Sequence, residues 1–166
     1  MRRMPPDSAL KFKPENLQIR RTQIETFMLV QRFQRAVDSR TGSCFRESGI
    51  ENLTPAQANV LMVLFQRRRP MSAREIHKEL GLSEVTISRL VSLLVRHGWV
   101  HRKPHQTDGR KMMLKPTQHA RAHLSVFMKT ANVLLEEMFD GFEESEIIQL
   151  HSLMVRIGLN FDLGSP

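Results

Sequence analysis

The sequence predicts a mainly α-helical fold with one small β-hairpin, and three observations lead to this fold class. Apolar residues recur at helical spacing along most of the chain. Residues 99–103 and 111–115 are two short strand-like stretches on either side of a polar turn. A short helix, a turn at Gly81 and a longer helix come directly before this hairpin. These are the parts of a winged helix-turn-helix, whose second helix enters the major groove of DNA.

The charge is unevenly distributed over the 166 residues, whose formal net charge is +8. Residues 83–116 contain seven Lys and Arg against two acids, a net charge of +5. Residues 117–166 contain three Lys and Arg against seven acids, a net charge of −4. The positive charge therefore lies on the predicted helix-turn-helix and hairpin, as expected for a unit that binds double-stranded DNA.

The composition argues against several other classes of protein. Cys44 is the single cysteine, so neither an intrachain disulfide nor a cysteine-based zinc site can form. No apolar run has the length of a membrane span and the polar start has no signal-peptide core, so we expect a cytoplasmic protein without membrane contact. His119 and His123 have zinc-compatible spacing but no matching further ligand, so no metal site is expected. Without a nucleophile motif, phosphate loop or paired carboxylates, we expect neither an enzyme nor a bound cofactor.

Two segments precede the predicted DNA-binding unit. Residues 1–14 are basic and proline-containing, and they form either a frayed terminus or an arm that touches DNA or a second subunit. Apolar residues at helical spacing predict a helix from about residue 15 to residue 40, followed by a loop over residues 40–52. We assign residues 15–52 to dimerisation, because a single small DNA-binding unit does not need so long a helix.

The winged head, residues 53–116, has a clear start and end for each helix. Thr54 and Gln57, with Pro55 between them, begin one helix, and Ser72 with Glu75 begins the next. Ser83 begins the second helix of the motif, which ends at Gly98. Its spacing predicts a packed side made of Ile87, Leu90, Val91 and Leu94. The opposite, solvent-exposed side would then carry Glu84, Val85, Ser88, Arg89 and Ser92, with Thr86 at its edge.

Residues 117–166 follow the hairpin and are predicted to be dimerisation helices. Thr117 caps a long helix that Gly141 ends, and a last helix has an apolar side predicted to face inward. The members of that side are Ile147, Leu150, Leu153, Met154 and Ile157. Apolar stripes on both flanks of a compact head can be covered by the same flanks of a second copy, which gives a two-fold homodimer.

With these elements in place, the chain resembles the MarR family of bacterial transcriptional regulators. The resemblance covers about residues 20–160, and the stretches that carry it are 53–57, 76–82, 86–91, 98–102, 107–111 and 114–117. Its most specific part is Gly98-Trp99-Val100 followed by Asp108 and Arg110 in a basic hairpin. Membership implies a triangular homodimer with two winged heads, built by the first and last helices. It also implies a ligand-responsive repressor that binds a pseudo-palindromic operator.

The exposed side of the second helix supplies the candidate base contacts. Arg89 can bond through two N–H groups to guanine O6 and N7, and Val85 and Thr86 offer methyl groups for thymine. Ser83 and Ser88 have short hydroxyls suited to phosphate. For Glu84, we favour a helix-capping role over a contact to cytosine.

The hairpin supplies a second set of DNA contacts. The family resemblance implies that Arg110 enters the minor groove and that Asp108 aligns it through an ion pair. The plainer alternative is a turn-stabilising aspartate beside an exposed arginine. Lys103 and Lys111 would neutralise phosphates and make binding depend steeply on salt.

The family resemblance also implies a small aromatic or anionic effector. A Met- and Phe-rich set could line its pocket, although plain core is the more common role of such residues: Phe27, Met28, Phe33, Met62, Phe65 and Met128. Two alternative functions stay open. Cys44, predicted in the loop near Arg40 and Arg46, could make the protein a thiol-redox-sensing regulator. The winged helix could instead serve as a protein-interaction module, because a fold does not fix a function.

Overall fold

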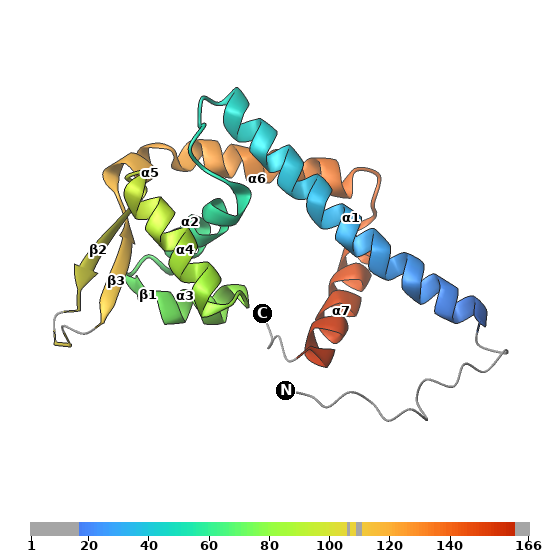
Figure 1. The fold of residues 1–166 in the computed structure, drawn as a ribbon. Coiled ribbons are helices and arrows are strands. Elements are labelled where there is room, and N and C mark those ends of the chain that lie inside the picture. The colour runs from blue at the N-terminus through green and yellow to red at the C-terminus, as the bar shows by residue number, and fades with distance from the viewer. Residues whose placement is uncertain (1–16, 106, 109–110, 162–166) are drawn as a thin grey trace. The chain divides into compact units, whose positions relative to one another are not determined.

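The computed structural model describes residues 17–105, 107–108 and 111–161. Over these residues the chain forms seven helices and three strands, in the order α1–α2–β1–α3–α4–β2–β3–α5–α6–α7 (Figure 1). The predicted arm at residues 1–14, and Arg110 of the hairpin turn, lie outside the described residues. No helix in the described part of the chain is long and apolar enough to cross a membrane.

The first helix, α1 (Leu17–Glu47), continues past the predicted end at residue 40, so the predicted loop over residues 40–52 is wrong for most of its length. Gly42 and Ser43 lie inside the helix, where one glycine costs only about 1 kcal/mol. Burial of Phe45 in the hydrophobic core offsets that cost. Gly49 ends the segment with a positive φ of 75°, a conformation that glycine adopts without strain. The chain divides into two compact units at Ser39, within α1.

The helices of the winged head begin where the sequence predicts. In α2 (Pro55–Arg67), the Thr54 hydroxyl accepts from the backbone N–H of Gln57, and the Gln57 side chain accepts from the Thr54 N–H. Ser72 and Glu75 form the same reciprocal pair at the start of α3 (Ala73–Leu80). Ser83 caps α4 (Glu84–Arg96). Each prediction rested on residues three positions apart, so it depended on local chemistry alone.

A three-stranded antiparallel sheet in the order β1–β3–β2 forms the wing. Strands β2 (Val100–Pro104) and β3 (Met112–Pro116) are each displaced by one residue from the prediction. Strand β1 (Met71–Ser72) was not predicted, because two residues are too short to show a periodicity. It pairs with β3 through Met71 and Leu114, both of which are buried. The sheet therefore ties the hairpin to the turn that precedes α3.

One hydrophobic core holds the head together. Ile87, Val91 and Leu94 of α4 are fully or almost fully buried, with Leu61 and Leu64 of α2 in the same cluster. The predicted packed side of α4 is thereby confirmed, with Leu90 half-buried at its edge. Because these side chains are close-packed, the orientation of α4 within the head is fixed.

The predicted long helix after Thr117 is broken, which corrects the sequence-based interpretation. A short α5 (Gln118–Ala122) ends at His123, and α6 (Leu124–Phe139) begins directly after it. The His123 N–H donates to the carbonyls of Ala120 and Arg121, which tightens the last turn of α5. On α6, Phe127 is buried in the core, whereas Met128, a residue of the predicted effector pocket, is exposed.

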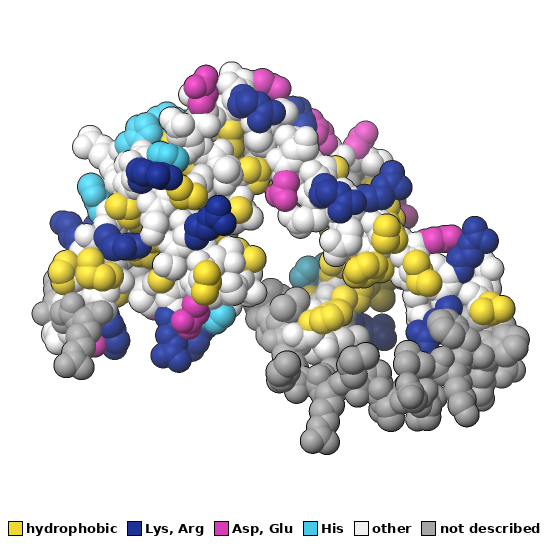
Figure 2. Space-filling view, in the orientation of Figure 1, with side chains coloured by type: hydrophobic (Ala, Val, Ile, Leu, Met, Phe, Trp, Pro, Cys, Tyr) yellow, Lys and Arg dark blue, Asp and Glu magenta, His cyan; other side chains and the backbone are white. Residues whose placement is uncertain are grey.

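The last helix, α7 (Glu144–Asn160), has no buried side chain in the single chain. The apolar side predicted to face inward is exposed at Leu150, Leu153, Met154 and Ile157. Exposed apolar side chains also gather on α1, including Ile24, and Figure 2 shows hydrophobic surface over both helices. The inward assignment for α7 is therefore wrong for an isolated chain.

Candidate nucleic-acid interface

The outward side of α4 is exposed as the sequence predicts. Val85 is 80% exposed, and Glu84, Thr86, Ser88 and Arg89 are exposed with it. A β-branched apolar side chain in that position stabilises nothing within the head, because it contacts mainly water. The helix therefore presents one apolar residue, two hydroxyls and one guanidinium on a rigid support.

The start of α4 is fixed by its N-cap. The Ser83 hydroxyl accepts from the backbone N–H of Thr86 at 3.1 Å and shares a hydrogen bond with the Thr86 hydroxyl at 2.8 Å. Ser83, and not Glu84, is thus the capping residue. Glu84 occupies the first turn, where a negative charge is favourable near the positive end of the helix dipole.

The turn between α3 and α4 contains a contact that the sequence did not reveal. Gly81 has a φ of 64°, and its N–H donates to the His77 carbonyl at 2.9 Å. The His77 ring nitrogen Nδ1 lies 2.5 Å from the Leu82 carbonyl oxygen, so this nitrogen carries the proton and donates. His77 thereby holds the residue that immediately precedes the α4 cap. A histidine in the last turn of a helix gives no sequence signal for this role.

Two arginines at the end of α2 hold α3 in place. Arg67 binds Glu79 and Arg69 binds Glu75, each with an N–O distance of 2.7 Å. Hydrogen bonds to the Glu75 carboxylate, chiefly from the Ser72 backbone N–H and also from Arg69, lower the pKa of Glu75 to about 2. The first helix of the motif is therefore positioned by charge as well as by packing.

The structure describes three of the four candidate DNA-contact residues of the wing, namely Lys103, Asp108 and Lys111. Lys103 is exposed on β2. The Lys111 ammonium lies 3.3 Å from the Asp108 carboxylate, and the Lys111 backbone N–H donates to the Asp108 carbonyl. The predicted pairing of Asp108 with Arg110 lies outside the described residues, so it stays a prediction.

The base of the wing is joined to α4 and α5 by Thr117 and Trp99. The buried Thr117 hydroxyl donates to the Gly98 carbonyl at 2.7 Å and accepts from the Ala120 N–H at 3.1 Å. His119 and His123 pack on the buried Trp99 ring, with ring centroids 4.3 and 5.3 Å from its own. These histidines thus support the wing. No group of three or more metal-ligand side chains is found among the described residues.

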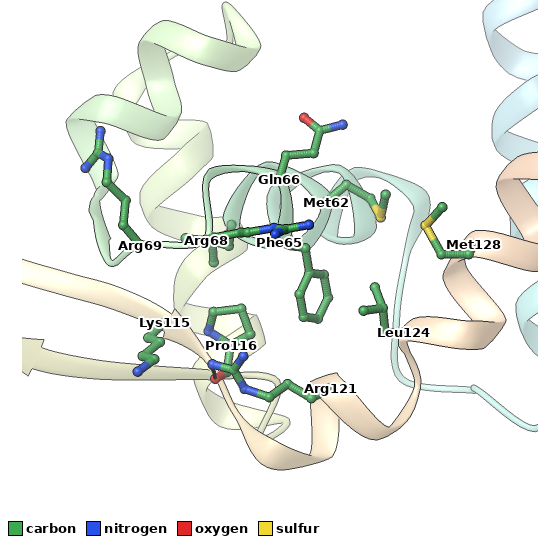
Figure 3. A pocket seen from close by; sticks show the side chains of 11 residues that line it. Met62, Phe65, Gln66, Arg68, Arg69, Lys115, Pro116, Arg121, Leu124 and Met128 are labelled. Atoms are coloured by element: carbon green, nitrogen blue, oxygen red, sulfur yellow. Dashed lines mark hydrogen bonds between the residues drawn. The ribbon is translucent and has the colours of Figure 1, made fainter.

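The residues proposed for an effector pocket fall into two sets. Met62, Phe65 and Met128 line one cavity of about 610 Å³ together with Leu124 (Figure 3). Basic side chains also line this cavity, namely Arg68, Arg69, Lys115 and Arg121. Phe27, Met28 and Phe33 belong to the other compact unit, where all three are exposed.

Arg68 differs from its two neighbours. Arg67 and Arg69 are paired with acids of α3, whereas no acidic partner binds Arg68 among the described residues. Arg68 is also the described non-glycine residue with a positive φ, 50°, at the end of α2. A non-glycine residue in this conformation costs of order 1 kcal/mol, and such strain gathers at functional sites. Arg68 and Phe65 line the same cavity, and Figure 3 labels both side chains.

The position of Cys44 corrects the redox interpretation. Cys44 lies within α1 and not in a loop, and its side chain is only 8% exposed. Arg46 donates to Ser43, and Arg40 binds Glu137 through two nitrogens, so both neighbouring arginines are engaged elsewhere. A buried thiol of this kind lacks the accessible, electropositive surroundings that make cysteines reactive.

Together, the exposed side of α4, the three-stranded wing and the turn at Gly81 define a winged helix-turn-helix protein. Residues 51–111 match the model of the MarR family, so this segment is similar to that family. The HTH-type transcriptional repressor YetL of Bacillus subtilis is 26% identical over 95 residues, which is 57% of this chain and 57% of that protein. The match thus spans little more than half of the relative's length.

Solved structures show the same fold. A mutant MarR from E. coli in complex with operator DNA has a TM-score of 0.72 at 20% identity, covering 88% of this chain and 99% of that one. BpsR of Bordetella bronchiseptica, whose DNA binding is regulated by 6-hydroxynicotinic acid, has a TM-score of 0.68 at 18% identity. That match covers 79% of this chain and 91% of BpsR. Both matches extend beyond the winged head.

Proposed function

We propose that this protein is a homodimeric DNA-binding transcriptional regulator, and specifically a ligand-responsive repressor. The observation that carries the proposal is the two-sided character of α4. Its apolar side is locked into the core, while Val85, Thr86, Ser88 and Arg89 face outward on the opposite side. A rigid helix with such a surface, set beside a basic wing, is suited to the DNA major groove. The similarity to the repressor YetL supports repression of transcription as the proposed mode of regulation.

On this proposal, base contacts come from α4 and phosphate contacts from its cap and the wing. Arg89 binds a guanine edge through two N–H groups, and Val85 meets a thymine methyl. The Ser83 hydroxyl is already used by the helix cap, so Ser88 and Lys103 are the better phosphate contacts. Arg110 enters the minor groove, as the resemblance implies. Asp108 and Lys111 form the pair that stabilises the turn.

We propose that the exposed apolar sides of α1 and α7 form the dimer interface. A monomer rarely leaves so many large apolar side chains in water on two helices. Residues 15–52 and 117–166 would then be dimerisation segments around the winged head. Two heads related by a two-fold axis would bind a pseudo-palindromic operator.

The cavity lined by α2, the end of β3, α5 and α6 fits a small aromatic anion. Its wall combines Phe65, Leu124 and Met62 with the guanidinium of Arg68, which has no acidic partner in the described part of the chain, so an aromatic ring and a carboxylate both find partners. The regulation of BpsR by 6-hydroxynicotinic acid, an aromatic acid, supports this ligand class. Such a ligand releases DNA only if it binds the arrangement without DNA more tightly.

The regulator proposal is tested by selecting binding sites from genomic DNA and titrating the selected duplex against a scrambled duplex at two salt concentrations. We expect selective binding that weakens steeply as salt rises, because phosphate contacts release counterions. Equal, weak binding to both duplexes would contradict the proposal. If the wild type shows no salt-dependent binding to either duplex, the result would favour the alternative that the winged helix is a protein-interaction module.

The effector proposal is tested with benzoate and 6-hydroxynicotinate as probes. We expect at least one of them to raise the melting temperature of the wild type and to release the selected duplex. The variant Arg68→Gln should lose both responses, whereas Lys129→Gln on α6 should keep them, because Lys129 does not line the cavity. Identical responses in wild type and Arg68→Gln would exclude this cavity as the site.

A further inference from the structure

The cavity of about 610 Å³ described above carries more positive charge than a single carboxylate neutralises. The described part of its wall contains four Lys and Arg side chains and neither Asp nor Glu: Arg68, Arg69, Lys115 and Arg121. Glu75 already binds Arg69 at an N–O distance of 2.7 Å. The other three have no acidic partner among the described residues. Three uncompensated cations therefore border one cavity.

Three different elements bring these cations together. Arg68 follows α2, Lys115 lies in β3 and Arg121 lies in α5. An N–H of Arg121 donates to the Pro116 carbonyl at 3.4 Å, which holds this guanidinium at the end of β3. All three residues are exposed, so the positive charge lies where the cavity opens to solvent. Like charges gathered around a concave surface attract anions and repel one another.

The opposite part of the wall is apolar. Met62, Phe65 and Leu124 line it and are half-buried against the hydrophobic core. The centroid of the Phe65 ring lies 6.2 Å from that of the buried Phe127, so Phe65 is supported from the core side. Aromatic rings pack favourably at such distances. A ligand that fits both parts has an aromatic body for these side chains and charged groups for the exposed cations.

We propose that this cavity binds an aromatic dianion, either an aryl phosphate monoester or an aromatic dicarboxylate. A single carboxylate that pairs with Arg68 leaves two cations uncompensated, whereas a second negative charge on the ligand pairs with Lys115 and Arg121. The two guanidinium groups suit carboxylate and phosphate in shape, because each donates two parallel N–H bonds. The proposal rests on the proposed effector function of this cavity and narrows its ligand from an aromatic anion to a dianion.

Isothermal titration calorimetry with phenyl phosphate and phenyl sulfate tests the charge of the ligand. Both probes have a phenyl ring and a tetrahedral group with terminal oxygens, but at pH 8 the phosphate has about two negative charges and the sulfate a single one. Each exposed ion pair contributes about threefold in affinity, so two further pairs should make phenyl phosphate bind about tenfold more tightly at low salt.

Isophthalate and benzoate form a second matched pair of probes, which distinguishes the two kinds of dianion. A preference for phenyl phosphate over phenyl sulfate alone identifies an aryl phosphate. A preference for isophthalate over benzoate alone identifies an aromatic dicarboxylate. Either result, or a preference within both pairs, supports the proposal. Equal affinities within both pairs would overturn it.

The pH dependence separates the charge of the probe from its shape. The second pKa of a phosphate monoester is about 6, so phenyl phosphate is mostly a monoanion at pH 5. Its preference over phenyl sulfate should therefore fall from about tenfold at pH 8 to about twofold at pH 5. Changes in the protein that affect both probes alike cancel in this ratio. The same ratio at both pH values would show that charge is not the cause.

The variants Lys115→Gln and Arg121→Gln identify the cations that receive the second charge. Each should reduce the preference for phenyl phosphate by about threefold and change the affinity for phenyl sulfate less. Arg121→Lys keeps the charge and should keep most of the preference. The control Lys129→Gln, on α6 and outside the cavity, should keep both affinities. A full preference in both glutamine variants would overturn the assignment to this cavity.

The same titrations distinguish failure of this proposal from failure of the effector function. If none of the four probes binds, the cavity is not an effector site, and the dianion proposal fails with it. If all four bind with equal affinity in the wild type and lose affinity in Arg68→Gln, the effector site stands and only the second charge is refuted.

Discussion

Thr117 joins the wing to the rest of the head, and its replacement by valine tests that connection. Valine has nearly the same shape as threonine but neither donates nor accepts a hydrogen bond. The substitution removes the bond to the Gly98 carbonyl and the cap on the Ala120 N–H. Loss of a helix cap costs about 1 kcal/mol. A partly buried carbonyl without its partner costs about 1 kcal/mol more.

We therefore expect Thr117→Val to lower the free energy of unfolding by about 2 kcal/mol. The assay is urea unfolding followed by tryptophan fluorescence, because Trp99 is the only tryptophan and is buried beside Thr117. Thr117→Ser keeps the hydroxyl and loses one methyl, so it should cost less than about 1 kcal/mol. A valine variant as stable as the wild type, or a serine variant as unstable as the valine variant, would refute the argument.

Three further predictions follow from single residues of the head and of α1. Hydrogen bonds to the Glu75 carboxylate, chiefly from the Ser72 backbone N–H and also from Arg69, lower the pKa of Glu75 to about 2. The ionised carboxylate therefore stabilises the fold above pH 4.5, and this contribution disappears as the pH falls from about 5 to 2. The pKa shift corresponds to about 3 kcal/mol of free energy of unfolding, and solvent screening reduces this to about 1–2 kcal/mol. When the free energy of unfolding is measured between about pH 5 and pH 2, the loss of stability should therefore be about 1–2 kcal/mol smaller in Glu75→Gln than in the wild type. Arg68→Gly should raise stability by about 0.5–1 kcal/mol in urea unfolding, because glycine adopts the positive φ without strain, while weakening anion binding; a destabilised variant would contradict this. Cys44 should react with a thiol reagent slowly in the native protein and rapidly in urea, and fast native labelling would show that its side chain is accessible.

The sequence predicted most reliably the features that depend on neighbouring residues. The caps at Thr54 and Ser72 and the two sides of α4 follow from spacings of three or four residues, and the structure confirms them. The extension of α1 past residue 40 and the break at His123 depend on contacts with distant residues. Phe45 packs against Phe127, and His123 packs against Trp99, so local glycine and capping signals could not decide these boundaries.

In the candidate sites too, features that depend on neighbouring residues could be predicted, and features that depend on distant contacts could not. Helical spacing identified Val85 and Arg89 as exposed, and strand alternation on its own could have grouped Lys103 with His101. The cavity could not be predicted, because it needs the end of α2, the end of β3 and α6 to meet. The role of Arg68 depends on a backbone conformation that arginine rarely adopts and that no sequence signal announces.

The central claim is that the exposed side of α4 contacts DNA bases, and the most direct test is the affinity of Arg89→Ala for the selected duplex. The control is Lys129→Ala, which removes one positive charge from α6. Loss of a two-bond contact to guanine costs about 1–3 kcal/mol, so Arg89→Ala should bind at least about fivefold more weakly and lose selectivity at one base pair. The control should bind like the wild type, and both variants should keep the wild-type oligomeric state. Unchanged affinity and selectivity in Arg89→Ala would contradict the account.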